Sequence, residues 1–351
     1  MTKKILFLTG TRADFGKLKS LIQRVDEREL LEAHIFVTGM HMLSKYGMTA
    51  NEVIKSGFKS IYKYINQNSS DSMDIVLSKT VHGLSDYVKE LRPDMIVVNG
   101  DRVEALAGAI VGSLNNILVA HVEGGEVSGT IDELIRHSVT KMSHIHFVSN
   151  ARARERLIQL GECKGSVFII GSPDLDIMLS SCLPSIGTVK ERYQIEFKDY
   201  ALLMYHPVTT ELDKIKRNVK KTVDGIINSG DNYVVIYPNN DLGSDYIINE
   251  FSRFKNNKRF RIFPSIRFEH FLTLLKNSLY IIGNSSAGVR EMPFYGIPSI
   301  NLGTRQENRA IASSIINIPE DKDLIVNSIN ACKLMTFYNC NFIPASCIAL
   351  R

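Results

Sequence analysis

The segment His121–His137, HVEGGEVSGTIDELIRH, gathers histidine, glutamate and aspartate side chains, the residue types that most often transfer protons in enzymes. It overlaps the apolar run Ile117–Val122, which predicts a buried parallel strand that ends directly before Glu123. In open α/β sheets, ligands bind at the carboxyl ends of the strands. Glu123 therefore lies where a catalytic carboxylate is expected.

A helix is expected to begin within the same segment. Thr130 and Glu133 have the Thr-x-x-Glu spacing of a capping box, in which side chains pair with main-chain N–H groups at a helix start. Asp132 then lies in the first helical turn, and Arg136 and His137 follow about one turn later. This cluster indicates proton transfer beside a strand end. Helix capping and surface ion pairing is the alternative interpretation.

A second carboxylate is predicted at the end of the preceding strand. The apolar run Met95–Val98 leads into Asn99-Gly100-Asp101-Arg102, and a helix rich in Ala and Gly is predicted over Val103–Leu114. Sequential strands are usually neighbours in such sheets, so Asp101 and Glu123 are expected at adjacent strand ends. Two carboxylates brought together acquire separated pKa values, which suits one acid and one base. For Asp101, a simple helix N-cap is the alternative.

A histidine marks a strand end in the second half of the chain. His206 closes a predicted strand, because Pro207 cannot continue a hydrogen-bonded ladder. We expect the His206 imidazole to face the same cleft as the carboxylates, with Asn239, at the end of the next strand, also lining it. A purely structural role for a strand-end histidine is the alternative.

Small and hydroxylated residues predict a phosphate site. The sequence GNSSAG lies between a predicted strand and a helix, so the Ser285 and Ser286 hydroxyls and helix-start amides can hold phosphate oxygens. Gly10-Thr11-Arg12 and Gly303-Thr304-Arg305 each place a cation beside amides that we expect to be exposed at a strand end. Glu291, on the helix after the serines, is a candidate acceptor for ribose hydroxyls. A helix cap for the serines and pairing elsewhere for the glutamate are the alternatives.

Strand-like and helical segments alternate along the chain, which is typical of parallel βαβ units. The expected strands are Ile5–Leu8, Ile35–Val37, Met95–Val98, Ile117–Val122, Ile145–Val148, Val167–Ile170, Ala201–Tyr205, Tyr233–Tyr237, Arg261–Phe263, Leu279–Ile282 and Ser299–Leu302, and further expected helices are Glu211–Asn228 and Phe268–Lys276. The predicted fold class is α/β, with two Rossmann-like domains facing each other across a cleft. We expect the first domain at residues 1–172, a linker region at 173–198 and the second domain at 199–351.

Composition excludes several classes of protein. The 351 residues are 44% hydrophobic and 23% charged, the balance of an ordinary globular protein. No apolar run is long enough to span a membrane, no signal-peptide pattern is present, and basic residues do not cluster with aromatic ones. We therefore expect a cytoplasmic protein that binds neither membrane nor nucleic acid. The net charge of +5 suits an anionic small substrate, and the five cysteines lack metal-site spacing, so no metal or other cofactor is expected.

Five segments together resemble the UDP-N-acetylglucosamine 2-epimerase family, in its hydrolysing branch. They are GTRADFGK at 10–17, NGDR at 99–102, HVEGGEVSGTID at 121–132, HPVTT at 206–210 and GNSSAGVRE at 283–291, in the family's order. The resemblance covers about residues 3–310 and implies a glycosyltransferase-B-like fold, with the active site between two Rossmann-like domains. Residues 337–351 depart from the family, because they lack the Gly/Ser/Thr-rich turn and charged helix expected there.

The resemblance also implies roles for individual residues. The implied catalytic residues are Asp101, Glu123, Asp132 and His206; Arg12, Arg102, Ser285, Ser286, Glu291 and Arg305 hold UDP; Arg136 lies near the sugar; and we add Lys17 and Asn239 as substrate-binding candidates. The family reaction removes the proton on carbon 2 of the sugar and expels UDP by anti elimination. The resulting 2-acetamidoglucal is then hydrated to N-acetylmannosamine. A base for the carbon proton and cations for the departing phosphate are both present, and which carboxylate is the base stays open.

Three functions remain open at this point. The first is a hydrolysing epimerase that acts on UDP-N-acetylglucosamine for sialic acid synthesis. The second is the same reaction on UDP-2,4-diacetamido-2,4,6-trideoxyglucose for legionaminic-acid-type sugars. The third is an inactive UDP-sugar-binding protein. The expected partner is a UDP-sugar, and assembly into a homo-oligomer, a dimer or tetramer, is expected.

Overall fold

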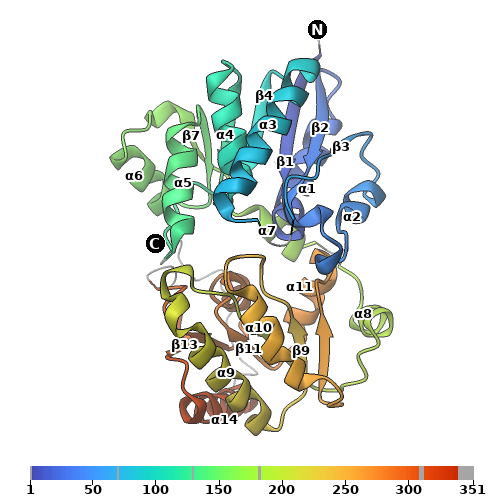
Figure 1. Ribbon diagram of the computed structural model, residues 1–351, viewed down its shortest axis with the longest axis vertical. Coiled ribbons are helices and arrows are strands. Elements are labelled where there is room, and N and C mark those ends of the chain that lie inside the picture. Colours follow the sequence, from blue (N-terminus) through green and yellow to red (C-terminus); the bar gives the residue numbers. More distant parts are fainter. Residues whose placement is uncertain (1, 69–70, 129, 181–182, 308–311, 339–351) are drawn as a thin grey trace. The chain divides into compact units, whose positions relative to one another are not determined.

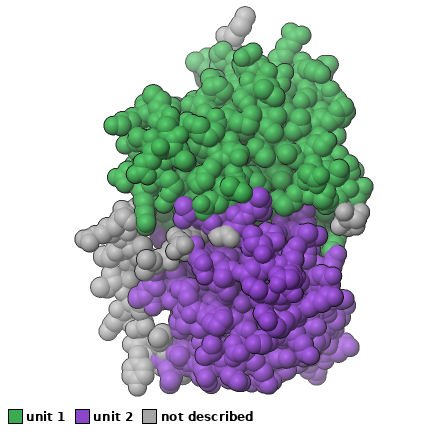
Figure 2. Space-filling model, turned by 60° about the vertical axis from the view of Figure 1, so that its left-hand side comes forward, with its two compact units in different colours: residues 1–126, 132–181, 350–351 green, residues 127–131, 182–349 purple. Residues whose placement is uncertain are grey.

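The computed structural model describes the chain except residues 1, 69–70, 129, 181–182, 308–311 and 339–351 (Figure 1). Two compact units divide it, the first consisting mainly of residues 1–126 and 132–181 and the second mainly of residues 182–349 (Figure 2). The segment 173–198 contains one helix of each unit, α7 (Pro173–Met178) and α8 (Ile186–Tyr193). Most of the atypical segment 337–351 lies outside the described residues.

The first unit is built on a parallel sheet with the strand order β3-β2-β1-β4-β5-β6-β7. The strands are β1 (Lys3–Thr9), β2 (Leu31–Val37), β3 (Ser60–Lys63), β4 (Met95–Asn99), β5 (Leu118–Val122), β6 (Ile145–Val148) and β7 (Val167–Ile169). The chain winds outward from β1 to β3, returns to the other side of β1, and winds outward again from β4. The winding therefore reverses between β1 and β4, where doubly wound sheets bind ligands.

Helices connect these strands and cover both faces of the sheet (Figure 1). They are α1 (Arg12–Asp26), α2 (Ala50–Lys55), α3 (Met73–Leu91), α4 (Val103–Leu114), α5 (Ile131–Lys141) and α6 (Ala151–Gln159), with short 3-10 turns η1 (Gly39–Met42), η2 (Ser44–Tyr46) and η3 (Lys164–Ser166). In α1, Phe15, Leu18 and Ile22 recur every three or four residues and so share one face. That face packs in one apolar cluster with Phe7 and Ile35 of the sheet.

The second unit repeats the same winding, with the strand order β10-β9-β8-β11-β12-β13. Its strands are β8 (Ala201–Met204), β9 (Tyr233–Ile236), β10 (Phe260–Phe263), β11 (Ile281–Gly283), β12 (Ser299–Leu302) and β13 (Ile315–Ile318). Its further helices are α9 (Ile215–Ser229), α10 (Ser244–Phe251), α11 (Phe268–Lys276), α12 (Ser286–Val289), α13 (Glu291–Phe294) and α14 (Lys322–Tyr338), with η4 (Thr209–Lys214) and η5 (Ser252–Phe254). Here the winding reverses between β8 and β11.

Buried tyrosine hydroxyl groups form a hydrogen-bonded group where strands of the second sheet begin. The Tyr280 hydroxyl donates to Asp231 at 2.7 Å and lies 2.7 Å from the Tyr233 hydroxyl. Lys333 of α14 pairs with the same aspartate at 2.6 Å. Each buried polar atom of this group thus has a partner, and α14 is tied to the sheet through it.

The predicted α/β class and all the predicted strands are confirmed. Most strand ends lie within two residues of their predicted positions, and β2 begins four residues earlier than predicted. β3 and β13 were not predicted. The expected helix Glu211–Asn228 is instead η4 followed by α9, because the chain kinks at Glu211 (φ −131°, ψ 35°). No helix among the described residues combines the length and apolar character needed to cross a bilayer.

We expect Gly283→Ala to lower the thermal midpoint of the protein. Gly283 ends β11 with φ +136°, and a Cβ there would collide with the main-chain carbonyl of Met204 on the neighbouring strand. A strained residue of this kind costs about 1–3 kcal/mol. Gly187→Ala is the control, since the nearest atom to a Cβ there is 3.8 Å away, and it should leave the midpoint unchanged or slightly raised. Equal midpoints for both variants would contradict the steric argument.

Candidate active site

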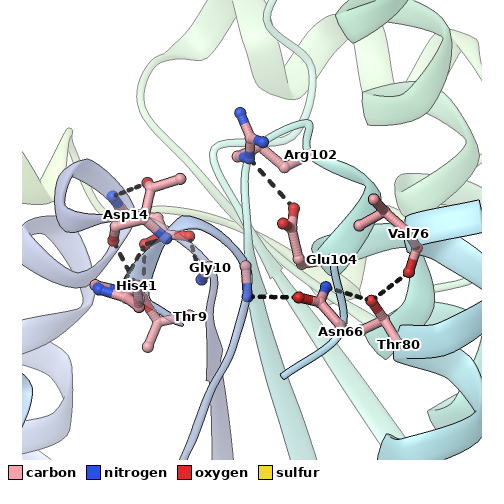
Figure 3. A network of polar contacts seen from close by, with 11 residues as sticks. Thr9, Gly10, Asp14, His41, Asn66, Val76, Thr80, Arg102 and Glu104 are labelled. Carbon is pink, nitrogen blue, oxygen red and sulfur yellow. Dashed lines mark hydrogen bonds and ion pairs between the residues drawn. The ribbon is translucent and has the colours of Figure 1, made fainter. Parts of the chain in front are cut away.

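The carboxylate of Asp14 holds the turn between β1 and α1 (Figure 3). It accepts hydrogen bonds from the N–H groups of Gly10 and Thr11, both at 2.9 Å, and from the Thr9 hydroxyl at 2.6 Å. Burial raises the pKa of Asp14, and these hydrogen bonds oppose the rise. The expectation of exposed amides at Gly10-Thr11-Arg12 is therefore wrong, because a carboxylate of the capping box already occupies them.

A buried histidine lies behind this turn. His41 Nε2 donates to the Thr9 hydroxyl at 3.0 Å, and Nδ1 accepts from the Thr49 hydroxyl at 2.6 Å. The Thr9 hydroxyl donates its proton to Asp14, so it can only accept from His41. The proton of the His41 ring therefore lies on Nε2. Burial lowers the pKa of His41 to about 3, so the ring is neutral at physiological pH.

The two arginines predicted at the ends of β1 and β4 each pair with a glutamate. Arg12 Nη2 lies 2.5 Å from Glu52 Oε1 of α2, and Arg102 Nε donates to Glu104 at 3.2 Å (Figure 3). Glu104 is buried, so Arg102 is anchored from the interior. Arg102 is also the N-cap residue of α4, which rules out the alternative that Asp101 caps this helix.

Asp101 and Glu123 follow the ends of neighbouring strands, as predicted, because β4 and β5 pair in parallel up to their last residues. Asp101 Oδ2 contacts Nη2 of Arg136 on α5. Arg136 Nη1 donates to the main-chain oxygen of Glu126 at 3.0 Å. The buried Arg136 thereby links the turn after β4 to the loop after β5.

A buried histidine that was not predicted as a site residue, His121, joins three elements of this site. Its Nε2 donates to the Gly100 carbonyl at 2.8 Å, and its Nδ1 accepts from the Thr140 hydroxyl of α5 at 3.1 Å. Burial lowers the pKa of His121 to about 4, so one ring nitrogen remains an acceptor at neutral pH. His121 thus fixes the turn that carries Asp101 against the helix that carries Asp132.

Glu123 has an unusual main-chain conformation. Its φ is +62°, a region that residues with a side chain rarely adopt. Its carboxylate is buried and accepts hydrogen bonds from Lys17 Nζ at 2.7 Å and from the Ser172 hydroxyl at 3.2 Å. Such strain persists where surrounding contacts over-determine it, and it is common at functional sites.

Asp132 lies in the first turn of α5, which begins at Ile131, directly after Thr130. The predicted site residues of the first unit therefore form two close pairs, Asp101 with Arg136 and Glu123 with Lys17. Asp132 lies one turn before Arg136 on the same helix, α5.

In the second unit, one asparagine fixes the main chain at His206. β8 ends at Met204, so the prediction that His206 closes the strand is wrong. The Asn284 side chain replaces the ladder there: Oδ1 accepts from the His206 N–H at 2.6 Å, and Nδ2 donates to the His206 carbonyl at 2.9 Å. His206 Nδ1 accepts from the main-chain N–H of Asn239 at 3.0 Å, so a neutral His206 carries its proton on Nε2.

The predicted cation Arg305 lies directly against the predicted phosphate turn. Arg305 Nη1 and Gln306 Nε2 donate to the Asn284 carbonyl at 3.2 Å and 2.9 Å, and both side chains are buried. Gln306 was not predicted, because a side-chain amide next to an arginine carries no distinguishing pattern. The Asn284 side chain thus pairs with His206, and its main-chain carbonyl pairs with Arg305 and Gln306.

The helix predicted after this turn is split into two short ones. Ser285 caps α12 by accepting from the Ala287 N–H at 3.3 Å, and the chain breaks at Arg290 before α13. Pro293 explains the break, since it lacks an N–H and its ring would clash with the carbonyl four residues earlier. Glu291, expected on the same helix as Ser286, instead begins α13, where it is buried.

Two doubly wound parallel sheets, with polar residues where each winding reverses, place the protein in the class of glycosyltransferase-B-like α/β proteins. The chain belongs to the UDP-N-acetylglucosamine 2-epimerase family, whose family model matches residues 23–336. The family predicted from the five sequence segments is thereby confirmed.

Individual relatives agree with this assignment. The chain is 48% identical to the UDP-N-acetylglucosamine 2-epimerase of Neisseria meningitidis serogroup B over 336 residues, 95% of this chain and 89% of that protein. It is 35% identical to the polysialic acid biosynthesis protein P7 of Escherichia coli, over 93% and 85% of the two chains. In fold it is similar to a crystal structure of UDP-GlcNAc 2-epimerase from Neisseria meningitidis bound to UDP-GlcNAc, with a TM-score of 0.77 at 16% identity over 95% and 92% of the chains.

We expect the stability of the first unit to fall as the pH is lowered from 7 to 4.5. His41 and His121 are neutral in the folded chain, where burial lowers their pKa values to about 3 and about 4 from 6.5. Below pH 6.5 the unfolded chain binds protons that the folded chain does not, so stability is lost from there down to the folded values. The loss should amount to several kcal/mol, measured by urea unfolding across this range.

Variants separate this effect from general acid denaturation. His121→Gln should make the dependence on pH shallower, because it removes one of the two groups. His82→Gln, at a side chain that is 79% exposed on α3, should leave the dependence unchanged. An unaltered dependence in His121→Gln would contradict the assignment.

Proposed function

We propose that the protein is a hydrolysing epimerase, which converts UDP-N-acetylglucosamine and water to N-acetylmannosamine and UDP. The observation that carries the proposal is the pair of carboxylates after neighbouring strands, Asp101 held by Arg136 and Glu123 held by Lys17. Family membership and the 48% identity to the Neisseria epimerase support the substrate. The similarity to polysialic acid biosynthesis protein P7 supports a place in sialic acid synthesis.

In this proposal the carboxylates divide the acid and base work of two steps. One takes the proton from carbon 2 as the bond between carbon 1 and the UDP oxygen breaks, which leaves 2-acetamidoglucal and UDP. Water then adds its oxygen to carbon 1. A proton is delivered to carbon 2 on the face opposite to the one from which the first proton was removed, which inverts this carbon. Asp101, Glu123 and Asp132 are the candidates, and a positioned group of this kind contributes about 10²–10⁴-fold.

The same proposal assigns UDP to the strand ends that carry cations and hydroxyl groups. Ser285, Ser286 and Arg305 are the candidate diphosphate ligands, His206 Nε2 is a candidate donor to the departing oxygen, and Glu291 is a candidate ribose acceptor. Arg12 and Arg102 remain candidates although each pairs with a glutamate. A guanidinium has five N–H donors, so one glutamate partner is compatible with a phosphate contact.

Incubation with UDP-N-acetylglucosamine in deuterated water, followed by proton and phosphorus NMR, tests the proposal. We expect UDP and N-acetylmannosamine that carries deuterium at carbon 2. UDP-N-acetylmannosamine as the product would indicate a non-hydrolysing epimerase instead. UDP binding without any turnover would support the inactive binding protein.

The same reaction on UDP-2,4-diacetamido-2,4,6-trideoxyglucose is the second candidate. The chain is 32% identical to a UDP-N,N'-diacetylbacillosamine 2-epimerase (hydrolyzing) of Legionella pneumophila over 94% of its length. The 48% identity to the Neisseria epimerase favours the first substrate. The ratio of kcat/KM for the two UDP-sugars decides between them.

We expect Asp101→Asn, Glu123→Gln and Asp132→Asn each to lower kcat by about 10²–10⁴-fold. UDP affinity should stay near that of the wild type and each variant should remain folded, since each amide is close in size to the carboxylate. Asp101→Asn and Glu123→Gln should lower the thermal midpoint, because each removes the ion partner of a buried cation. A UDP-release assay measures turnover and calorimetry measures binding. Asp86→Asn on α3, at a side chain that is 62% exposed, is the matched control and should keep full activity. Wild-type kcat in all three variants would remove the carboxylates from the mechanism.

A further inference from the structure

A third buried carboxylate in the first unit, Asp174 of α7, lies against the two side chains that hold Glu123. Asp174 Oδ2 is 3.3 Å from Lys17 Nζ and 3.3 Å from the Ser172 hydroxyl oxygen. Glu123 lies 2.7 Å and 3.2 Å from the same two atoms. Asp174 is 2% exposed and Glu123 is 4% exposed. Two buried carboxylates thus share one ammonium and one hydroxyl group.

The two carboxylates cannot share these partners equally. The Ser172 hydroxyl has one proton, so it donates to only one of the two carboxylates at a time. A second negative charge within a few ångströms of a buried carboxylate disfavours its ionised form, and burial strengthens the effect because water screens little there. Lys17 offsets part of this repulsion, and its ammonium is divided between two acceptors.

We propose that Asp174 is a positioning residue that acts through Glu123, raising the affinity of Glu123 for a proton so that it exchanges protons near neutral pH. This inference rests on the proposed function, because it assigns Glu123 to proton transfer with the sugar. Asp174 itself need not touch the substrate. Its charge and its shared partners are sufficient for the effect.

Several other ionisable groups on or next to β5, α7 and α1 are either neutral or exposed. His121 on β5 is neutral above its lowered pKa of about 4 and adds no charge at working pH. Asp176 on α7 and Arg24 on α1 line a groove between the two helices, together with Glu27, which pairs with Arg24 at 3.0 Å. These three groups are solvent-facing, so water screens them. Lys17 on α1 is the cation that contacts both carboxylates.

The dependence of kcat and KM on pH, measured from pH 5 to 9 with UDP-N-acetylglucosamine, tests the proposal. In Asp174→Asn, the limb of the pH profile that reports the ionisation of Glu123 should move to lower pH by about one unit. Loss of the neighbouring negative charge favours the ionised form of Glu123. The direction is the same whether Glu123 serves as base or as acid. Ser172→Ala should move the limb to higher pH, because a hydrogen bond to the ionised form is lost.

The controls distinguish this role from packing. Asp176→Asn, two residues along α7, should reproduce the wild-type pH profile, and Asp174→Glu should restore it because it keeps the charge. If Asp174→Asn does not fold, Asp174→Ser takes its place. A profile of Asp174→Asn or Asp174→Ser that coincides with that of the wild type overturns the inference, even where kcat is lower. Failure of the wild type to release UDP overturns the proposed function itself, so the two failures are distinct.

Discussion

Main-chain groups just beyond the end of a parallel strand have lost their ladder partners, and where they are buried they need other partners. Side chains supply such partners at several strand ends among the described residues. Asp14 pairs with the turn after β1, His121 with the turn after β4, and Asn284 with the segment after β8. Each of these segments carries a candidate reactive or binding side chain, such as Asp101 beside Gly100 or His206 itself. The positions of the candidate site therefore depend on buried polar pairing, and a change that unpairs a turn alters the site together with the stability.

The same pairing explains the distribution of charge. Burying a carboxylate costs free energy unless a cation or hydrogen-bond donors accompany it, and Asp101 and Glu123 each have a cation in contact. A carboxylate held in this way keeps a fixed direction, which proton transfer to or from carbon requires. The histidines, in contrast, are buried as neutral rings whose proton is assigned by their neighbours. Neutral histidines thus help to organise the strand ends of the first unit, together with the carboxylate of Asp14.

Most of the fold was predictable because a parallel strand covered on both faces appears as a continuous apolar run. β3 was missed because Ser60–Lys63 is a short edge strand, half of it polar. β13 was missed because it is also an edge strand, in which Asn317 interrupts the apolar run and no residue is fully buried. The polar residues that follow these apolar runs could be assigned to strand ends, because the end of each run marks where the strand stops. Their partners could not be assigned, since single side-chain contacts such as Lys17 to Glu123, 106 residues apart, leave no repeating pattern. The pairing of Asn284 with His206, 78 residues away, was not predicted for the same reason.

In the proposed reaction, UDP leaves by breakage of the bond between carbon 1 of the sugar and the bridging oxygen, with the carboxylates after β4 and β5 as acid and base. Reaction in water enriched in oxygen-18, followed by mass spectrometry of the released UDP, tests this most directly. Elimination predicts UDP without added oxygen-18, because UDP keeps its own bridging oxygen and water attacks the sugar. UDP that carries one oxygen-18 atom would show attack of water on phosphorus and would contradict elimination from the sugar.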